Sequence, residues 1–301
     1  MDAIATRGLS RRFRAGGGVD TIDLRVPTGS LYGFLGPNGA GKTTTIRLLL
    51  GLLRPQSGRI EIDGQPLDAQ RAALREVGAM VESPTLYPHL SARDNLRCTQ
   101  TLLGLPAPRI DEVLEIVSLR DAANQKVREF SLGMRQRLGI AQALLASPRL
   151  LILDEPSNGL DPAGMADMRR LLQRFTREGI TVFLSSHLLA EIEQMASHVG
   201  VIERGRLRFQ GTLPELQALA QPSLRIRCSE PARAQRIIEA SGQRAQVLSD
   251  GEVVVEAPTL PVSSLTRALF EGGLELHGVR ESRPTLEDLF LTMTEQQKAA
   301  A

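Results

Sequence analysis

The chain has 301 residues, of which 42% are hydrophobic and 23% are charged, and its formal net charge at pH 7 is +2. This length fits one large domain or two smaller ones, with ample apolar content for a buried core. Because the net charge is small and arginine is spread thinly, nucleic-acid binding has no electrostatic support. The two cysteines, Cys98 and Cys228, lie far apart in the sequence, which favours neither a disulfide framework nor a zinc site.

No apolar stretch approaches the roughly 20 residues that are needed to cross a bilayer. The first residues, MDAIATRGLSRRF, contain no apolar signal core. We therefore expect a cytoplasmic protein without direct membrane insertion, unless a partner holds it at a membrane.

Strand and helix patterns alternate from the N-terminus to about residue 211, which predicts an α/β fold with a mostly parallel sheet covered by helices. The expected strands cover residues 31–35, 59–62, 77–81, 150–153, 180–184 and 199–202. Between residues 84 and 147 the pattern is helical, with Ser91 and Asp94 as a capping box at one helix start and a short amphipathic helix at 110–117. We expect a domain over residues 1–215 with an inserted helical subdomain at about 84–147.

The pattern changes at about residue 223, after a short helix at 214–220 and a linker at Gln221 and Pro222. A strand (224–228), a helix (231–240), a hairpin around 249–251, a helix (263–270) and a strand (274–280) follow. This order predicts a small C-terminal α+β module of ferredoxin-like type over residues 223–301, closed by an amphipathic helix at 286–294.

Residues 36–43 read GPNGAGKT and match the nucleotide-phosphate loop G-x-x-x-x-G-K-[ST] at every fixed position. An apolar strand leads into the run and an amphipathic helix, expected at residues 44–53, leads out of it. The glycines let successive N–H groups turn toward phosphate oxygens, Lys42 brings a positive charge to the β and γ phosphates, and Thr43 offers a hydroxyl to Mg²⁺. We expect nucleotide contacts from Gly36, Asn38, Gly39, Gly41, Lys42, Thr43 and Thr44.

A second run, LLILDE at residues 150–155, predicts a buried strand that ends in two carboxylates. In nucleotide hydrolases Asp154 would hold Mg²⁺, directly or through water, and Glu155 would polarise the attacking water as general base. Taken alone, these six residues fit a strand that ends in solvated acids better than they fit this catalytic role. Their place after a phosphate loop reverses that preference. A GTPase or a small-molecule kinase would share the loop, but the chain has no N-K-x-D run to read guanine.

Further runs give the chain a family resemblance. Residues 130–137, FSLGMRQR, resemble the signature LSGGQ-x-Q-R, matched at Ser131 and Gly133 but not at Phe130, Leu132 or Met134. Together with the phosphate loop and the two carboxylates, this run resembles the ATP-binding subunit of an ABC transporter over about residues 1–215. The resemblance implies a P-loop NTPase fold of the ABC type that binds ATP and Mg²⁺ and hydrolyses ATP.

The same resemblance assigns roles to three more residues. Asp161 takes the acidic position of the D-loop within SNGLDP at residues 157–162, and His187, after the strand at 180–184, would contact the γ-phosphate. Phe13 precedes the phosphate loop where the family often stacks an aromatic ring on adenine, although the arginines around it could equally mark a solvated edge strand.

Glu82 departs from the family pattern, because most ABC ATPases have a glutamine after the strand at 77–81. We expect Glu82 to ligate Mg²⁺ or to orient the attacking water; the alternative is a solvated acid at a strand end. A glutamate here, combined with FSLGM in the signature, is similar to the ATPases of bacitracin and lantibiotic self-protection exporters.

The resemblance implies a head-to-tail homodimer in which each ATP lies between the phosphate loop of one chain and Ser131 to Gly133 of the other. An integral membrane permease would be a separate subunit, contacted near residues 87–90, and would hold this chain on the cytoplasmic face of the membrane. The expected function is ATP-driven export of an antibiotic-like, peptide or lipid substrate. The alternatives are a cytosolic ABC ATPase that acts as a mechanical switch on ribosomes or DNA, which usually carries two cassettes or a coiled coil, and a regulatory subunit with a dead site.

Overall fold

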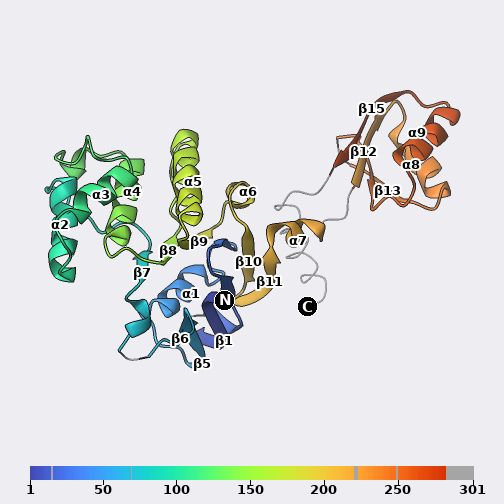
Figure 1. Ribbon diagram of the computed structural model, residues 1–301. Helices are drawn as coiled ribbons and strands as arrows, with labels where there is room; N and C mark the ends of the chain where they lie inside the picture. Colours follow the sequence, from blue (N-terminus) through green and yellow to red (C-terminus); the bar gives the residue numbers. More distant parts are fainter. Residues whose placement is uncertain (15, 69, 220–222, 249, 283–301) are drawn as a thin grey trace. The chain divides into compact units, whose positions relative to one another are not determined.

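The computed structural model describes residues 1–14, 16–68, 70–219, 223–248 and 250–282 (Figure 1). The chain forms two compact units, Met1–Leu213 and Pro214–Ala301. Within the described residues, no helix is both long enough and apolar enough to span a membrane.

A six-stranded sheet forms the centre of the first unit, in the order β11-β10-β4-β9-β8-β7. Its strands are β4 (Leu31–Leu35), β7 (Val77–Met80), β8 (Leu150–Asp154), β9 (Thr181–Ser186), β10 (His198–Glu203) and β11 (Arg206–Thr212). All neighbours pair in parallel except β10 and β11. Every residue of β4, β8 and β9 is buried, as is typical of parallel strands covered on both faces. The predicted mostly parallel sheet is therefore confirmed.

A second, antiparallel sheet contains β1 (Asp2–Arg12), β2 (Gly18–Ile22), β3 (Arg25–Pro27), β5 (Ser57–Ile62) and β6 (Gln65–Pro66). The strand expected at 59–62 lies here, within β5, rather than in the parallel sheet. Its apolar residues Ile60 and Ile62 alternate with less buried positions, which is the pattern of a strand with one face toward the core. They share one hydrophobic cluster with Ile46 of helix α1 (Lys42–Leu49).

Three helices form the inserted subdomain, and Figure 1 shows them gathered in one bundle: α2 (Ala92–Leu103), α3 (Arg109–Ile116) and α4 (Leu132–Leu144). Ser91 caps α2, accepting from the N–H of Asp94, and its hydroxyl donates to the Asp94 carboxylate at 2.6 Å. Ser131 caps α4 by accepting from the N–H of Met134. Two further helices follow strands of the parallel sheet, α5 (Pro162–Arg177), capped by Asp161, and α6 (Leu189–Glu193).

The second unit begins with α7, whose bounds are Leu213–Ala218, and continues as β12 (Ser223–Cys228), α8 (Pro231–Ala240), β13 (Arg244–Val247), β14 (Val253–Glu256), α9 (Val262–Glu271) and β15 (Leu276–Ser282). The strand order is β13-β14-β12-β15 and all pairs are antiparallel. This is the predicted ferredoxin-like arrangement, and its core contains Leu224, Ile226, Ile238, Val255 and Leu269. The helix expected at 286–294 lies outside the described residues.

Candidate functional site

The loop between β4 and α1 has a backbone that only glycine permits at several positions. Gly39 and Gly41 have φ angles of 79° and 109°, in the left-handed region that side chains disfavour. A Cβ on Gly36 would lie 2.3 Å from the carbonyl oxygen of Ile202. Helix α1 begins at Lys42, two residues earlier than the sequence predicts, and its first N–H groups have no side-chain cap. Free N–H groups at a helix start favour an anion.

Lys42 is the first residue of α1, and its side chain is only 6% exposed. Its Nζ donates a hydrogen bond of 2.7 Å to the carbonyl oxygen of Gly36 and lies 3.2 Å from Oε1 of Glu155. A buried ammonium is costly unless an anion compensates it. Glu155 supplies that charge, which brings the residue after β8 to the phosphate loop.

Ser185, on β9, holds both carboxylate-bearing residues at the end of β8. Its hydroxyl donates to Oδ1 of Asp154 at 2.5 Å and accepts from the backbone N–H of Glu155 at 3.0 Å. Asp154 is 2% exposed, so this donor offsets part of the cost of burying its carboxylate. Ser185 has no role that the sequence predicts. Only the register of β8 and β9, which pairs Asp154 with Ser185, reveals it.

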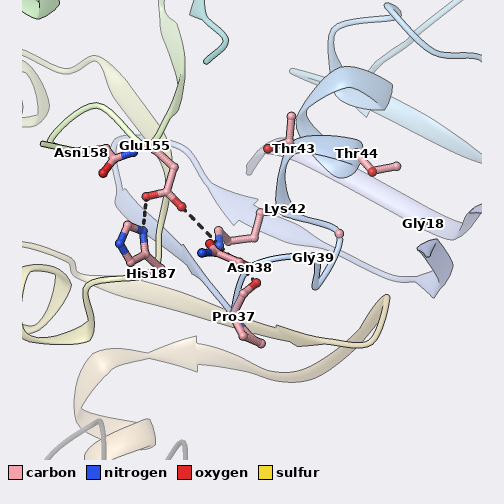
Figure 2. A pocket seen from close by; sticks show the side chains of 11 residues that line it. Gly18, Pro37, Asn38, Gly39, Lys42, Thr43, Thr44, Glu155, Asn158 and His187 are labelled. Atoms are coloured by element: carbon pink, nitrogen blue, oxygen red, sulfur yellow. Dashed lines mark hydrogen bonds and ion pairs between the residues drawn. The ribbon is translucent and has the colours of Figure 1, made fainter. Parts of the chain in front are cut away.

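His187, which directly follows β9, contacts the carboxylate of Glu155. Its Nδ1 lies 2.6 Å from Oε2 of Glu155. Figure 2 shows the Glu155 carboxylate between the ammonium of Lys42 and the imidazole of His187. Because a carboxylate can only accept, Nδ1 carries the proton and Nε2 is the ring nitrogen left for a ligand.

These groups open onto a pocket of about 380 Å³. It is lined by Gly18, Pro37, Asn38, Gly39, Gly41, Lys42, Thr43, Thr44, Glu155, Asn158 and His187. The phosphate-loop residues and two predicted catalytic residues thus meet in one place. Gly18, Pro37 and Asn158 are not among the predicted site residues, although Pro37 lies within the phosphate-loop run and Asn158 between Glu155 and Asp161; Gly18 has no such signal.

Of the two residues expected to hold Mg²⁺ beside the nucleotide, Thr43 lines the pocket, whereas the buried Asp154 does not and lies directly before Glu155, which does. No group of three or more His, Cys, Asp or Glu side chains with metal-site geometry occurs among the described residues. Mg²⁺ commonly binds through one or two carboxylates together with substrate phosphates, so this small donor set matches a metal that arrives with ATP.

Four residues expected at the phosphate and metal site do not line this pocket: Gly36, whose carbonyl accepts from Lys42, the buried Asp154, and Glu82 and Phe13. The carboxylate of Glu82 is 62% exposed and pairs with Arg47 of α1, on a backbone with φ of 59°. The ring of Phe13 lies 5.5 Å from the guanidinium carbon of Arg11. Neither residue lines the pocket, and the metal role of Glu82 and the stacking role of Phe13 stay predictions.

Ser131, Gly133 and Asp161 line a different pocket, of about 440 Å³, between the starts of α4 and α5. Its other lining residues include Leu132, Gly159 and Leu160. None of these six lines the phosphate pocket of the same chain. The signature-like loop, which we define as Ser131 to Gly133, therefore does not complete the nucleotide site formed by its own phosphate loop.

Comparison with known proteins agrees with this geometry. The model of the ABC transporter family matches residues 19–158. The chain is 42% identical over 295 residues to the bacitracin transport ATP-binding protein BcrA of Bacillus licheniformis, covering 96% of both chains. It is 43% identical over 189 residues to the lantibiotic transport ATP-binding protein SrtF of Streptococcus pyogenes, covering 63% of this chain and 82% of that protein.

Among solved structures, cbiO1 from Clostridium perfringens, part of the ABC transporter complex cbiONQ, superposes with a TM-score of 0.66 at 28% identity. The match covers 72% of this chain and 91% of that chain. The similarity in sequence and fold shows that the chain belongs to the ATP-binding proteins of the ABC transporter family.

Proposed function

We propose that this protein is the ATP-hydrolysing subunit of an exporter, that it works as a homodimer, and that it acts on a separate membrane permease. The observation that carries the proposal is the position of Glu155, within 3.2 Å of Lys42 and 2.6 Å of His187. A base, a phosphate-binding cation and an imidazole meet at one phosphate loop, which is the arrangement that ATP hydrolysis requires.

Each residue has a distinct part in the proposed reaction. The N–H groups at the start of α1 and the ammonium of Lys42 bind the β and γ phosphates, and Lys42 would exchange at least one of its contacts with Gly36, Pro37 and Glu155 for a phosphate oxygen. Thr43 and Asp154 would hold Mg²⁺, which neutralises charge on the phosphate oxygens when bound. Glu155 accepts the proton of the attacking water, and His187 fixes the direction of that carboxylate through Nδ1.

The signature-like loop supports the homodimer. Its residues and Asp161 lie in a pocket separate from the phosphate pocket. If two copies meet head to tail, the hydroxyl of Ser131 and the free N–H groups at the start of α4 of each chain reach the ATP held by the other. Both ATP sites then close together in an arrangement with twofold symmetry.

A groove between the sheet and the helical subdomain supports the permease contact. It has a volume of about 700 Å³ and is lined by residues of β7, α2 and α4 together with Ser83, Pro84 and Thr85. Tyr87, an exposed aromatic residue, follows these residues in the chain. A protein segment that packs here would touch the chain directly after Glu82, on the cytoplasmic face of the membrane.

An antibiotic-like substrate, peptide or lipid in nature, is supported by the names of the relatives, which refer to bacitracin and lantibiotic transport. The substrate would be carried by the permease, because no helix among the described residues crosses a membrane.

The test uses the purified full chain. We expect slow Mg²⁺-dependent ATP hydrolysis, and we expect Glu155→Gln to block hydrolysis while ATP converts that variant from monomer to dimer in light scattering. ADP serves as the control ligand. A Glu155→Gln variant that binds ATP and stays monomeric would contradict the dimer, and co-purification with ribosomes instead of a multi-span membrane protein would contradict export.

A further inference from the structure

Two leucines and two glycines join the signature-like loop to the segment that precedes α5. A Cβ on Gly159 would lie 3.0 Å from Cδ2 of Leu132, and a Cβ on Gly133 would lie 3.7 Å from Cδ2 of Leu160. Each loop therefore places a leucine over the glycine of the other. We call these four residues the leucine–glycine clasp.

One side of the clasp is joined to the catalytic carboxylate by two consecutive turns. The N–H of Asn158 donates to the carbonyl of Glu155 at 3.1 Å, and the N–H of Leu160 donates to the carbonyl of Ser157 at 3.2 Å. Asp161 then caps α5. The path from Glu155 to the clasp is thus a short hydrogen-bonded segment and not a free loop.

The other side of the clasp is the start of α4. Ser131 accepts from the N–H of Met134 at 3.2 Å, so the loop that carries Leu132 is fixed to the helix. Leu132 itself stands where the family signature has glycine, and its side chain is 38% exposed. A Cβ at position 159 would be closer to Leu132 than ordinary van der Waals contact, so the end of the Leu132 side chain would have to shift.

We propose that the clasp makes Leu132 a positioning residue that links the two ATP sites of the dimer. This proposal rests on the proposed homodimer. There, the signature-like loop of a chain closes on the ATP of its partner, while Glu155 of the same chain serves its own ATP. Because packed side chains transmit displacement with little compression, closure at one site moves the turn that carries Glu155 at the other, which couples the sites.

The test compares Leu132→Ala with the unchanged full-length protein in steady-state ATP hydrolysis. In the unchanged protein the Hill coefficient for ATP should approach about two, since the dimer has two sites. Leu132→Ala should lower it toward one and reduce kcat by roughly 10- to 100-fold, because small displacements of catalytic groups have effects of that size. Leu132→Met retains a long apolar side chain, so its Hill coefficient and kcat should be close to those of the unchanged protein.

Two further measurements separate positioning from general damage. Leu102→Ala is the matched control, since Leu102 lies in the same helical subdomain and is 87% exposed; its kinetics should equal those of the unchanged protein. The KM for ATP of Leu132→Ala should change less than kcat, because the variant keeps Ser131 and the N–H groups at the start of α4, which the proposed dimer places on the partner's ATP. Leu132→Ala with an unchanged Hill coefficient and kcat would overturn the proposal.

The contact itself is tested by denaturant unfolding, independently of ATP. Gly159→Ala should destabilise the protein for two reasons: φ is 77°, and the new Cβ would lie 3.0 Å from Leu132. Gly179→Ala is the control for the backbone cost alone, because φ is 91° and no atom lies within 4 Å of the new Cβ. Adding Leu132→Ala to Gly159→Ala should raise the unfolding midpoint above the additive value. Additive midpoints would overturn the clasp. A Hill coefficient of one in the unchanged protein would contradict the proposed dimer. The unfolding midpoints of the two single variants and the double variant would still decide whether the clasp exists.

Discussion

Nδ1 of His187 lies 2.6 Å from Oε2 of Glu155, although the two residues are 32 positions apart in the chain. They meet because β8 and β9 are parallel neighbours, with Asp154 opposite Ser185, so both residues follow strand ends at the same edge of the sheet. This contact gives the carboxylate one direction, which a general base needs in order to reach a single water molecule.

Replacing His187 should therefore reduce catalysis more than binding. We expect His187→Ala to lower kcat for ATP by roughly 100-fold or more, the range found for positioned acid–base groups, while nucleotide affinity changes little because Lys42 and the phosphate loop are intact. Phosphate release and equilibrium binding measure the two quantities. His277→Ala is the control, since His277 is an exposed residue of β15 in the other unit. Equal losses of affinity and kcat would assign His187 to binding instead.

The second prediction concerns Ser185 and the stability of the protein. Ser185→Ala leaves the buried Asp154 carboxylate without this donor and the N–H of Glu155 without its acceptor. We expect the free energy of unfolding to fall by about 1–3 kcal/mol and kcat to fall with it. Ser186→Ala is the matched control: within the part of the chain that the structure describes, the Ser186 hydroxyl accepts a single hydrogen bond, from the N–H of Leu188, so its loss should cost less. A stability unchanged by Ser185→Ala would show that water replaces the hydroxyl.

Glu82 offers a test between a metal role and a surface ion pair. An exposed pair such as Glu82 with Arg47 contributes at most about 1 kcal/mol to stability. If Glu82 takes part at the metal, Glu82→Gln should raise the Mg²⁺ concentration that gives half-maximal ATP hydrolysis and alter its pH profile, whereas Arg47→Ala should leave both unchanged. Identical Mg²⁺ titrations and pH profiles of Glu82→Gln and the unchanged protein would assign Glu82 to the surface.

The parts of the site that the sequence predicts are those whose signal is local. The phosphate loop is one continuous run, and the apolar residues before Asp154 and Glu155 mark a buried strand directly. The C-terminal module was predictable for the same reason, since the hydrophobic residues of each strand and helix follow the periodicity of that element and the connections are short.

The parts that the sequence does not predict depend on pairing between distant segments. Ser185 acquires its role only from the register of β8 and β9, and Arg47 meets Glu82 from a helix 35 residues earlier. The strand at 59–62 has the composition of a strand in either sheet, and only its pairing with β1 places it in the antiparallel one. Burial and charge compensation at such contacts depend on the tertiary structure, so they cannot be predicted from any single segment of the sequence.

Glu191, a buried residue of α6, gives a prediction for pH dependence. Burial raises the pKa of its carboxyl above the usual value of 4.5, and the nearby Ser157 hydroxyl and Arg169 charge oppose this only in part. The folded state then binds the proton more readily than the unfolded state. Stability contributed by the protonated group is present below the unfolded pKa and is lost as pH rises through the folded pKa.

Glu191→Gln removes this loss, because glutamine has nearly the same shape and does not ionise. We expect the variant and the unchanged protein to unfold at similar urea concentrations below pH 4.5. As the pH rises toward neutrality, Glu191→Gln should become the more stable of the two, since the unchanged protein must keep an ionised carboxylate buried. Ser157→Ala should widen this gap when made in the unchanged protein, because its hydroxyl favours the ionised form. If the unchanged protein were instead more stable than Glu191→Gln at pH 8, the charge of Arg169 would outweigh burial and Glu191 would be a stabilising ion-pair partner.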